Sequence, residues 1–396
     1  MLRRAMSQRL RPQVILLGLV SLLNDSASEM IYPLLPVFLT STLGATPLIV
    51  GLIEGSADAL ASILKLFAGA MSDRMPRRKP LIVAGYALAA ASRAWIAVAG
   101  RWPSVLGARL LDRTGKGIRS APRDALIADV TPEESRGKAF GFHRALDHTG
   151  AVVGPLLALL FLDALHLPLR TIFLIAVIPG AIAVVLLLAI LREEPRERRR
   201  DAAKPGGGTP PLPFWIALTG ISLFSLANSS DVYLILQAHA AGVSTALLPA
   251  LWGAHHVIKA LFSTPAGARS DTAGRRKLLV AGWLSYAVIY FIFPFAHGPA
   301  FFFALFVAYA VPFTLSEGAE RAWISDLVPA PIRGKSFGIY YLASGLFVLA
   351  GTALFGALYE HVSPRAAFHT GAALAVAAAA AVIAGSGKTS PRPSAR

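Results

Sequence analysis

Charged side chains interrupt several long apolar stretches of this chain, and one group of them recurs at helical spacing. Arg109, Asp112, Lys116, Arg119 and Arg123 follow one another at steps of three or four residues. On an α-helix this spacing places all five on one face. Exposing such residues to lipid costs about 2.5–3.5 kcal/mol each on insertion scales. This face must therefore meet protein or a water-filled cavity.

Two carboxylates, Asp25 and Glu29, stand four residues apart near the middle of the first apolar stretch. A carboxylate at that depth can take up and release a proton if water reaches it from each side of the membrane in turn. We predict that Asp25 and Glu29, together with Asp231 in the second half of the chain, couple transport to protons. The alternative is permanent pairing with Lys116, Arg119 or Arg144.

Other polar residues at mid-membrane depth are expected to line a substrate cavity. They are Glu54, Asp58, Asp112, Lys116, Arg119, Arg144, Asp147, His148, Asn228, His255 and Lys259. Lys116 and Arg119 favour an anionic substrate, whereas Asp25 and Glu29 favour a cationic one, so both remain possible. No spacing typical of a metal site is present, and we predict none.

A pair of adjacent opposite charges occurs in reversed order in the two halves of the chain. Arg123-Asp124 lies in the fourth apolar stretch, and Glu320-Arg321 lies at the corresponding place in the tenth. Reversed polarity of this kind would suit ion pairing between the two stretches.

The composition places these residues in a membrane protein. The chain has 396 residues, of which 55% are hydrophobic, and its mean hydropathy is +0.58. Most of its apolar stretches reach about 20 residues, enough to cross a hydrocarbon core. Twelve transmembrane helices are predicted, at roughly 12–40, 47–71, 80–100, 103–127, 137–163, 170–192, 213–241, 246–268, 278–296, 299–324, 335–361 and 365–385.

The net charge of +16 comes from an uneven distribution of basic residues. With these twelve helices, 25 lysines and arginines fall on the side of the chain termini and 3 on the other side. Cytoplasmic loops carry such an excess, so both termini are predicted to be cytoplasmic. The charge therefore reflects membrane topology, with the lipid bilayer as partner, and not nucleic-acid binding.

An internal repeat divides the chain. The phrase at 69–80 returns at 267–278 with its Gly, Ser, Asp, Arg, Arg and Lys positions retained. An Asp followed by Arg-Gly-Lys-x-Phe-Gly occurs at 129–141 and again at 326–338. The offsets agree within one residue (267 − 69 = 198; 326 − 129 = 197). Two homologous halves are predicted, as in transporters built from paired repeats.

The hydrophilic stretch between the halves is rich in charge, Gly and Pro, which is typical of a flexible linker. We predict a first six-helix bundle over 1–192, a cytoplasmic linker over 193–212, a second bundle over 213–385 and a cytoplasmic tail over 386–396.

The repeated phrases resemble the loop signatures of the major facilitator superfamily, and the resemblance covers essentially the whole chain. It implies an all-α integral membrane fold of twelve transmembrane helices in two homologous six-helix bundles. It also implies a cytoplasmic gate of charged residues that breaks when the transporter opens inward. The gate residues would be Gly69, Asp73, Arg77, Asp129, Arg136, Asp271, Arg275, Asp326 and Arg333.

The fifth apolar stretch contains Gly141, Gly150, Gly154 and Pro155, which resemble the helix 5 motif of the antiporter branch of that superfamily. Glycines four residues apart allow a helix to approach its neighbour closely, and a proline bends it. By resemblance, this packing seals the two halves against leakage.

The predicted function is secondary active transport, namely proton-coupled efflux of a small molecule by alternating access. Efflux of a divalent metal or metal chelate, and proton-coupled uptake by symport, are the alternatives. No nucleophile–base arrangement or cofactor fingerprint is present, so neither enzymatic activity nor a cofactor is expected. The partners would be the substrate, protons and lipid, and the chain is expected to act as a monomer in the bacterial inner membrane.

Overall fold

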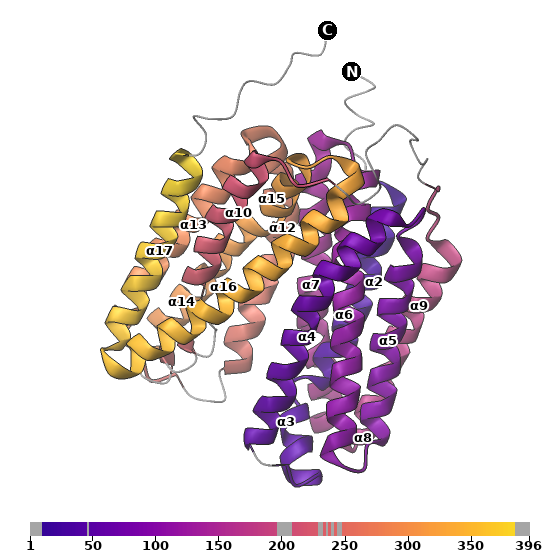
Figure 1. Ribbon diagram of the computed structural model, residues 1–396. Coiled ribbons are helices and arrows are strands. Elements are labelled where there is room, and N and C mark those ends of the chain that lie inside the picture. Colours follow the sequence, from indigo (N-terminus) through magenta and orange to yellow (C-terminus); the bar gives the residue numbers. More distant parts are fainter. Residues whose placement is uncertain are drawn as a thin grey trace.

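The computed structural model describes residues 10–45, 47–195, 208–228, 233–234, 237–238, 241–243 and 248–384. Over these residues the secondary structure is helical and contains no strand. The helices form twelve membrane segments in two bundles, coloured indigo to magenta and pink to yellow in Figure 1. The predicted fold class is confirmed.

The first bundle contains six segments, three of them interrupted or extended by short helical turns. Its helices are α2 (Pro12–Ile31), α3 (Leu35–Val37), η1 (Phe38–Thr42), α4 (Pro47–Arg74), α5 (Lys79–Val98), α6 (Trp102–Val130), η2 (Glu133–Ser135), α7 (Arg136–Leu159), η3 (Leu160–Ala164), α8 (Leu169–Ile175) and α9 (Val177–Ile190). Proline in the first turn starts α2, α5 and α6. Proline suits this position because its missing N–H would lack an intrahelical partner there anyway.

The second bundle repeats this order. Its helices are α10 (Leu212–Ala227), α12 (Leu248–Ala273), α13 (Arg275–Ile292), η5 (Phe293–Phe295), α14 (Pro299–Ala308), α15 (Ala310–Asp326), η6 (Ala330–Ile332), α16 (Arg333–His361) and α17 (Pro364–Ala384). The proposed linker, 193–212, lies between α9 and α10, and 196–207 of it lie outside the described residues. The proposed tail, 386–396, lies outside them as well.

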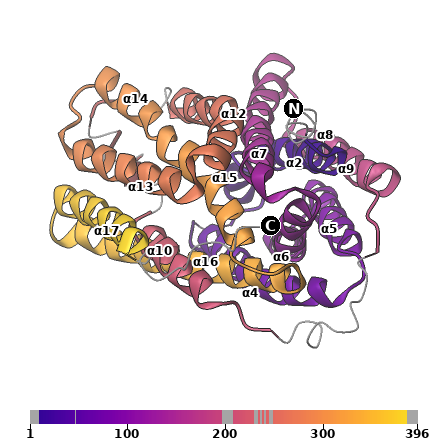
Figure 2. The same cartoon turned by 90° about the horizontal axis from the view of Figure 1, so that it is seen from above.

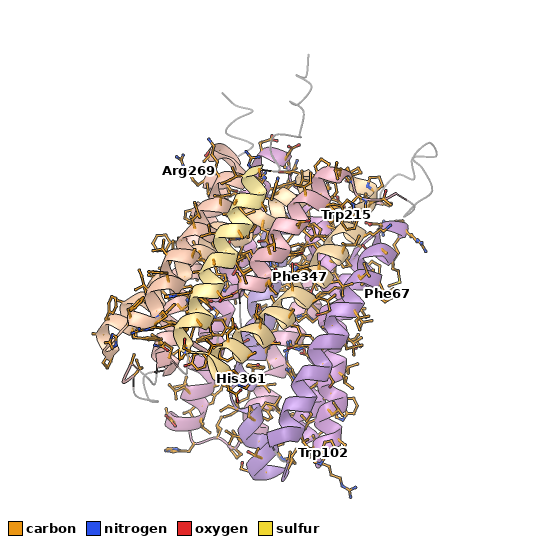
Figure 3. The ribbon with its side chains drawn as sticks, turned by 60° about the vertical axis from the view of Figure 1, so that its left-hand side comes forward. Phe67, Trp102, Trp215, Arg269, Phe347 and His361 are labelled. Atoms are coloured by element: carbon orange, nitrogen blue, oxygen red, sulfur yellow. The ribbon has the colours of Figure 1, made fainter. Side chains whose placement is uncertain are left out.

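Eight of the described spans are long and apolar enough to cross a membrane by composition alone. The others are α10, which is shorter, and α4, α6 and α12, whose charged or histidine side chains reduce their apolarity. Phe67, Trp215 and Phe347 are exposed on the outer surface, where a lipid-facing side chain belongs (Figure 3). The polar side chains of these less apolar helices must be kept away from lipid, and these helices line the interior of the protein.

The two bundles meet through two equivalent helix pairs. Figure 2 shows α7 beside α12 and α4 beside α16. Both pairs are tightest near the membrane surface at which α2 begins and α17 ends, here called the terminal side (Figure 1). There Gly69 lies against the backbone of Gly334, and Gly137 lies against that of Gly267. Any side chain at these four positions would hold the bundles apart.

Candidate functional site: a gate and a cavity

A first group of charges joins the bundles on the terminal side. Asp73, at the end of α4, accepts hydrogen bonds from the backbone N–H groups of Gly334 (2.9 Å) and Lys335 (2.7 Å), which begin α16. A carboxylate is stabilised at a helix N-terminus by its free N–H groups and dipole. Arg78 pairs with Asp73 at 2.8 Å and with Asp129 at 3.1 Å.

A second group repeats these contacts with the bundles exchanged. Asp271, at the end of α12, accepts hydrogen bonds at 2.8 Å from the backbone N–H groups of Gly137 and Lys138, which begin α7. Arg275 pairs with Asp271 and with Asp326, the latter at 2.5 Å. We call the two groups together the gate.

Two further ion pairs complete the gate by crossing between the bundles. Arg136 of α7 pairs with Asp326 of α15 at 2.6 Å, and Arg333 of α16 pairs with Asp129 of α6. All four side chains are largely buried, so breaking one pair leaves a charge without its partner. Such a loss typically costs about 3–5 kcal/mol.

The prediction of Arg77 in the gate requires correction, because Arg78 occupies that place and Arg77 is exposed. The stretch from the gate aspartate to the gate arginine is one residue longer in the first half than in the second. Five positions separate Asp73 from Arg78, whereas four separate Asp271 from Arg275. Matching the phrases letter by letter therefore selected the wrong arginine of an Arg-Arg pair.

The helix 5 glycines make two different contacts. Gly141 lies against the backbone of α12 at Ser263, in the other bundle. Gly150 and Gly154 lie against α2 within the same bundle, with no space for a further carbon atom. The helix continues past Pro155 to Leu159. Only the first glycine therefore contributes to the contact between bundles that the resemblance implies for the motif.

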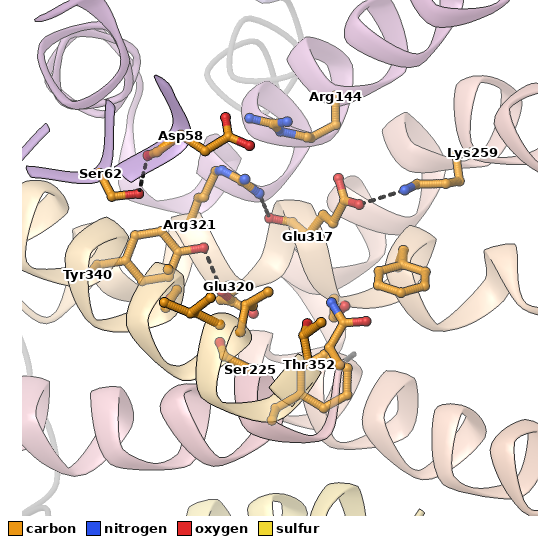
Figure 4. Close-up of a pocket in the computed structure, with 18 of the residues that line it drawn as sticks. Asp58, Ser62, Arg144, Ser225, Lys259, Glu317, Glu320, Arg321, Tyr340 and Thr352 are labelled. Atoms are coloured by element: carbon orange, nitrogen blue, oxygen red, sulfur yellow. Dashed lines mark hydrogen bonds and ion pairs between the residues drawn. The ribbon is translucent and has the colours of Figure 1, made fainter. Parts of the chain in front are cut away.

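A cavity of about 960 Å³ lies between the bundles, lined by residues of α4, α6, α7, α10, α12, α15 and α16 (Figure 4). The structure places seven of the predicted cavity residues in its wall: Asp58, Lys116, Arg144, His148, Asn228, His255 and Lys259. It adds polar and aromatic residues that the prediction did not include: Lys65, Phe224, Ser225, Trp252, Tyr309, Phe313, Ser316, Glu317, Glu320, Arg321 and Tyr340.

Three predicted cavity residues lie elsewhere, held by neighbours. Asp112 pairs with Arg109 at 3.3 Å, and the Arg119 guanidinium lies 4.4 Å from the ring centre of Tyr86. Asp147 pairs with Arg144 at 2.9 Å and accepts a hydrogen bond from the Ser21 hydroxyl. The Glu54 side chain and Asp231 lie outside the described residues.

Asp25 and Glu29 are placed on α2, where Gly150 and Gly154 of α7 approach it. Asp25 accepts a hydrogen bond from the Asn24 amide at 3.0 Å. Among the described residues, neither carboxylate forms an ion pair with Lys116, Arg144 or any other base. Neither lies in the cavity wall.

A polar bridge crosses the cavity between the bundles. Glu317 of α15 pairs with Lys259 of α12 at 2.8 Å, and His148 Nε2 of α7 lies 3.3 Å from its other oxygen. The opposite nitrogen of His148 lies 3.3 Å from His256 Nδ1. Glu320 accepts a hydrogen bond from the Tyr340 hydroxyl at 2.6 Å (Figure 4).

The reversed charge pairs of α6 and α15 do meet. Arg321 Nε lies 3.6 Å from Asp124 Oδ2, which confirms the pairing expected from their reversed order. Tyr341 of α16 donates a hydrogen bond to the same carboxylate. The comparison of the fourth and tenth apolar stretches already predicted that α15 lies opposite α6. It could therefore also have identified Glu317 and Glu320, on α15, as cavity residues.

The profile of the Major Facilitator Superfamily matches residues 17–255 and 239–396. The chain belongs to this superfamily. It is accordingly a multi-pass membrane transporter of small molecules, not an enzyme. An uncharacterized MFS-type transporter of Methanocaldococcus jannaschii is 32% identical over 375 residues, which cover 93% of this chain and 94% of that protein. The multidrug resistance protein MdtH of Edwardsiella ictaluri is 35% identical over 128 residues, 32% of this chain and 31% of that protein.

Solved structures share the fold at low sequence identity. The human organic anion transporter MFSD10 has a TM-score of 0.76 and 17% identity, over 94% of this chain and 100% of that one. The transporter FucP in its outward conformation has a TM-score of 0.75 and 17% identity, over 93% of this chain and 97% of that one. At this level of identity the likeness concerns the fold alone.

Proposed function

We propose that this transporter exports a small molecule in exchange for protons, with Asp25 and Glu29 as coupling carboxylates. The observation that carries the proposal is their placement. They lie side by side on α2, inside the bundle, without an ion-pair partner among the described residues. A carboxylate held permanently by a base cannot exchange its proton during transport, whereas these two are free to do so. Asp231 remains a third proposed coupling residue.

Motion of the two bundles would carry the substrate across. The gate closes the terminal side in this structure, and the cavity lies beyond it between the bundles. Breaking the gate and forming contacts at the other side would expose the cavity to the opposite compartment, as alternating access requires. We therefore propose that the gate residues, with Arg78 in place of Arg77, control access to the cavity. The residues of the cavity wall are proposed to hold the substrate.

Export is supported by the helix 5 resemblance, of which Gly141 packs against the other bundle, and by the multidrug resistance protein that matches about a third of the chain. The metal alternative gains no support, because the described residues contain no group of three or more His, Asp or Glu side chains suited to hold a metal ion. The termini are proposed to be cytoplasmic on the basis of the basic loops, and the bacterial inner membrane remains the proposed location.

Uptake by symport is the second candidate, and the position of Lys116 favours it. Lys116 lies within electrostatic range of both Asp25 and Glu29. Protonating these carboxylates would release its charge for an anionic substrate, so that proton and anion would bind together. If binding of a proton favours binding of the anion, the two are carried across the membrane in the same direction.

The sign of a proton flux separates the two candidates. Purified protein would first be screened by thermal shift against antibiotics, organic acids, siderophores and divalent metals, because a bound ligand raises the melting temperature. A stabilising compound would then be added outside proteoliposomes that contain a pH-sensitive dye. Antiport makes the lumen alkaline as the compound enters, whereas symport makes it acidic.

The same assay tests the coupling residues. Asp25→Asn and Glu29→Gln are expected to abolish the pH change while exchange of labelled against unlabelled substrate continues. If both single variants and the double variant retain the wild-type pH change, the coupling assignment is wrong.

A further inference from the structure

Two lysines of the cavity wall form no ion pair within the part of the chain that the structure describes. Lys65 extends from α4 and Lys116 from α6, and both line the cavity. The two helices touch where Gly117 lies against Ala61 and Leu64, so the lysines come from adjoining turns. Among the described residues, no carboxylate forms an ion pair with either amine. Lys65 instead lies 4.8 Å from the ring centre of Tyr341.

The acids of the cavity wall are already engaged. Asp58 pairs with Arg113 at 3.0 Å, and Glu317 receives Lys259 and His148. Glu320 is held by the Tyr340 hydroxyl. The lysines therefore remain as positive charge that faces the cavity and is not used in an ion pair. Lys116 is exposed and Lys65 partly exposed, so both amines are accessible to an anion that enters the cavity.

The opposite wall has another character. Beside polar residues such as the Lys259–Glu317 pair, the second bundle contributes five aromatic side chains: Phe224, Trp252, Tyr309, Phe313 and Tyr340. Trp252 and Phe313 are partly exposed, so their rings are available for contact. Aromatic faces bind flat apolar groups through burial and offset stacking.

We propose that the cavity binds an organic anion with an aromatic body, its acidic group held by Lys65 and Lys116 and its ring held against Trp252 and Phe313. Asp25 and Glu29, which would favour a cation, are outside the cavity wall. Arg119, which seemed suited to an anion, is packed on Tyr86. The inference rests on the proposed transport of a small molecule, and its test measures binding alone, whichever way the substrate moves.

Three probes that share one ring system test the charge preference. They are 1-naphthoate, 1-naphthamide and 1-naphthylmethylammonium, with charges of −1, 0 and +1. Binding to the purified full-length protein would be measured by isothermal titration calorimetry in detergent. Naphthoate is expected to bind ~100-fold more tightly than the amide, which corresponds to two charge contacts of about tenfold each. Equal or tighter binding of the amide or the cation, or no binding of naphthoate, overturns the proposal.

Variants then test the residues. Lys65→Gln and Lys116→Gln are each expected to weaken naphthoate about 10-fold and to leave the amide unchanged. Lys116→Arg, which keeps the charge, should retain most of the affinity. Lys277→Gln removes the same charge from an exposed position and should have no effect. Trp252→Leu should weaken naphthoate and amide alike. If the Lys65→Gln and Lys116→Gln variants bind naphthoate as tightly as the Lys277→Gln control, Lys65 and Lys116 do not bind the anion.

Failure of this proposal and failure of the proposed function give different results. Naphthoate binding in detergent without any proton flux in proteoliposomes contradicts proton-coupled transport and leaves the binding site standing. Proton-coupled movement of a cation that is unaffected by Lys65→Gln and Lys116→Gln contradicts the anion site and leaves the transport function standing.

Discussion

The gate and the cavity lie in the same pair of bundles, but they follow the internal repeat to different degrees. Each gate contact has a counterpart: Asp73 holds the start of α16 as Asp271 holds the start of α7. The cavity walls have no such correspondence. The first bundle contributes Lys65 and Lys116, which form no ion pair among the described residues, whereas the second contributes aromatic rings and a lysine, Lys259, that is paired with Glu317.

This difference separates two requirements of a transporter. A gate must close one side of the membrane by bringing two similar bundles together, and equal contacts on both sides of a twofold axis do this. A binding site must match a substrate that has no such symmetry. We therefore expect substitutions in the gate to act in symmetric pairs and those in the cavity to act singly.

The largest effect is expected from removing both gate carboxylates that hold helix starts. Asp73→Asn with Asp271→Asn disrupts two buried charge clusters, each worth about 3–5 kcal/mol when broken. Since about 5.5 kcal/mol turns a 99:1 population into 1:99, the terminal side should open. The chain has no cysteine, so spin labels at Arg77→Cys and Arg276→Cys can report the distance across this side.

In the double variant, most molecules are expected to show a longer distance between the two spin labels. Each single variant is expected to show a mixture of the short and the long distance. Glu134→Gln, an exposed acid on the same side, is the control and should leave the short distance unchanged. A short distance in the double variant would show that these carboxylates do not hold the gate closed.

The next effect distinguishes the two arginines of the first loop. Arg78→Gln leaves Asp73 and Asp129 without this cation and should cost about 3–5 kcal/mol of stability. Arg275→Gln should cost a similar amount because its contacts are equivalent. Arg77→Gln, on the exposed neighbour, should stay within about 0.5 kcal/mol. Melting temperatures of the three variants test this order, and equal values for Arg77→Gln and Arg78→Gln would contradict the corrected gate.

Symmetric packing predicts a smaller pair of effects. Gly154 lies against α2 near Glu29, and Gly351 lies at the corresponding place against Leu226 of α10. Leucine at either position should overpack the contact and cost about 1–3 kcal/mol. Gly253→Leu, where a side chain meets open space, is the control. Thermal unfolding should separate both variants from the control, and an effect of only one would break the symmetry.

The smallest effect concerns the cavity alone. Glu317→Gln removes the negative charge that holds Lys259, so the freed lysine can attract an anion. Naphthoate should then bind a few times more tightly, a gain of about 1 kcal/mol or less. Glu360→Gln, an exposed acid on the same helix bundle, should change nothing. Weaker naphthoate binding in Glu317→Gln would mean that Glu317 supports the site and does not compete with the anion.

The repeat in the sequence was sufficient to predict the fold and the pairing of Arg321 with Asp124, because both depend on which helices correspond. The gate arginine was misassigned because a single extra loop residue shifts Arg78 into the place expected for Arg77. The cavity was predicted only in part. Depth along a helix can be counted from the sequence, but which face meets another helix depends on packing. Packing turns Asp112 and Arg119 away from the cavity and brings Glu317 and Lys65 into it.

The most direct test of the division between gate and cavity compares two double variants by one ratio, the affinity for 1-naphthoate divided by that for 1-naphthamide. Lys65→Gln with Lys116→Gln should bring this ratio to about one, since the charge contacts are gone. Asp73→Asn with Asp271→Asn should leave it at the wild-type value, even though the gate opens. A wild-type ratio in the lysine variant, or a ratio near one in the gate variant, would contradict the account.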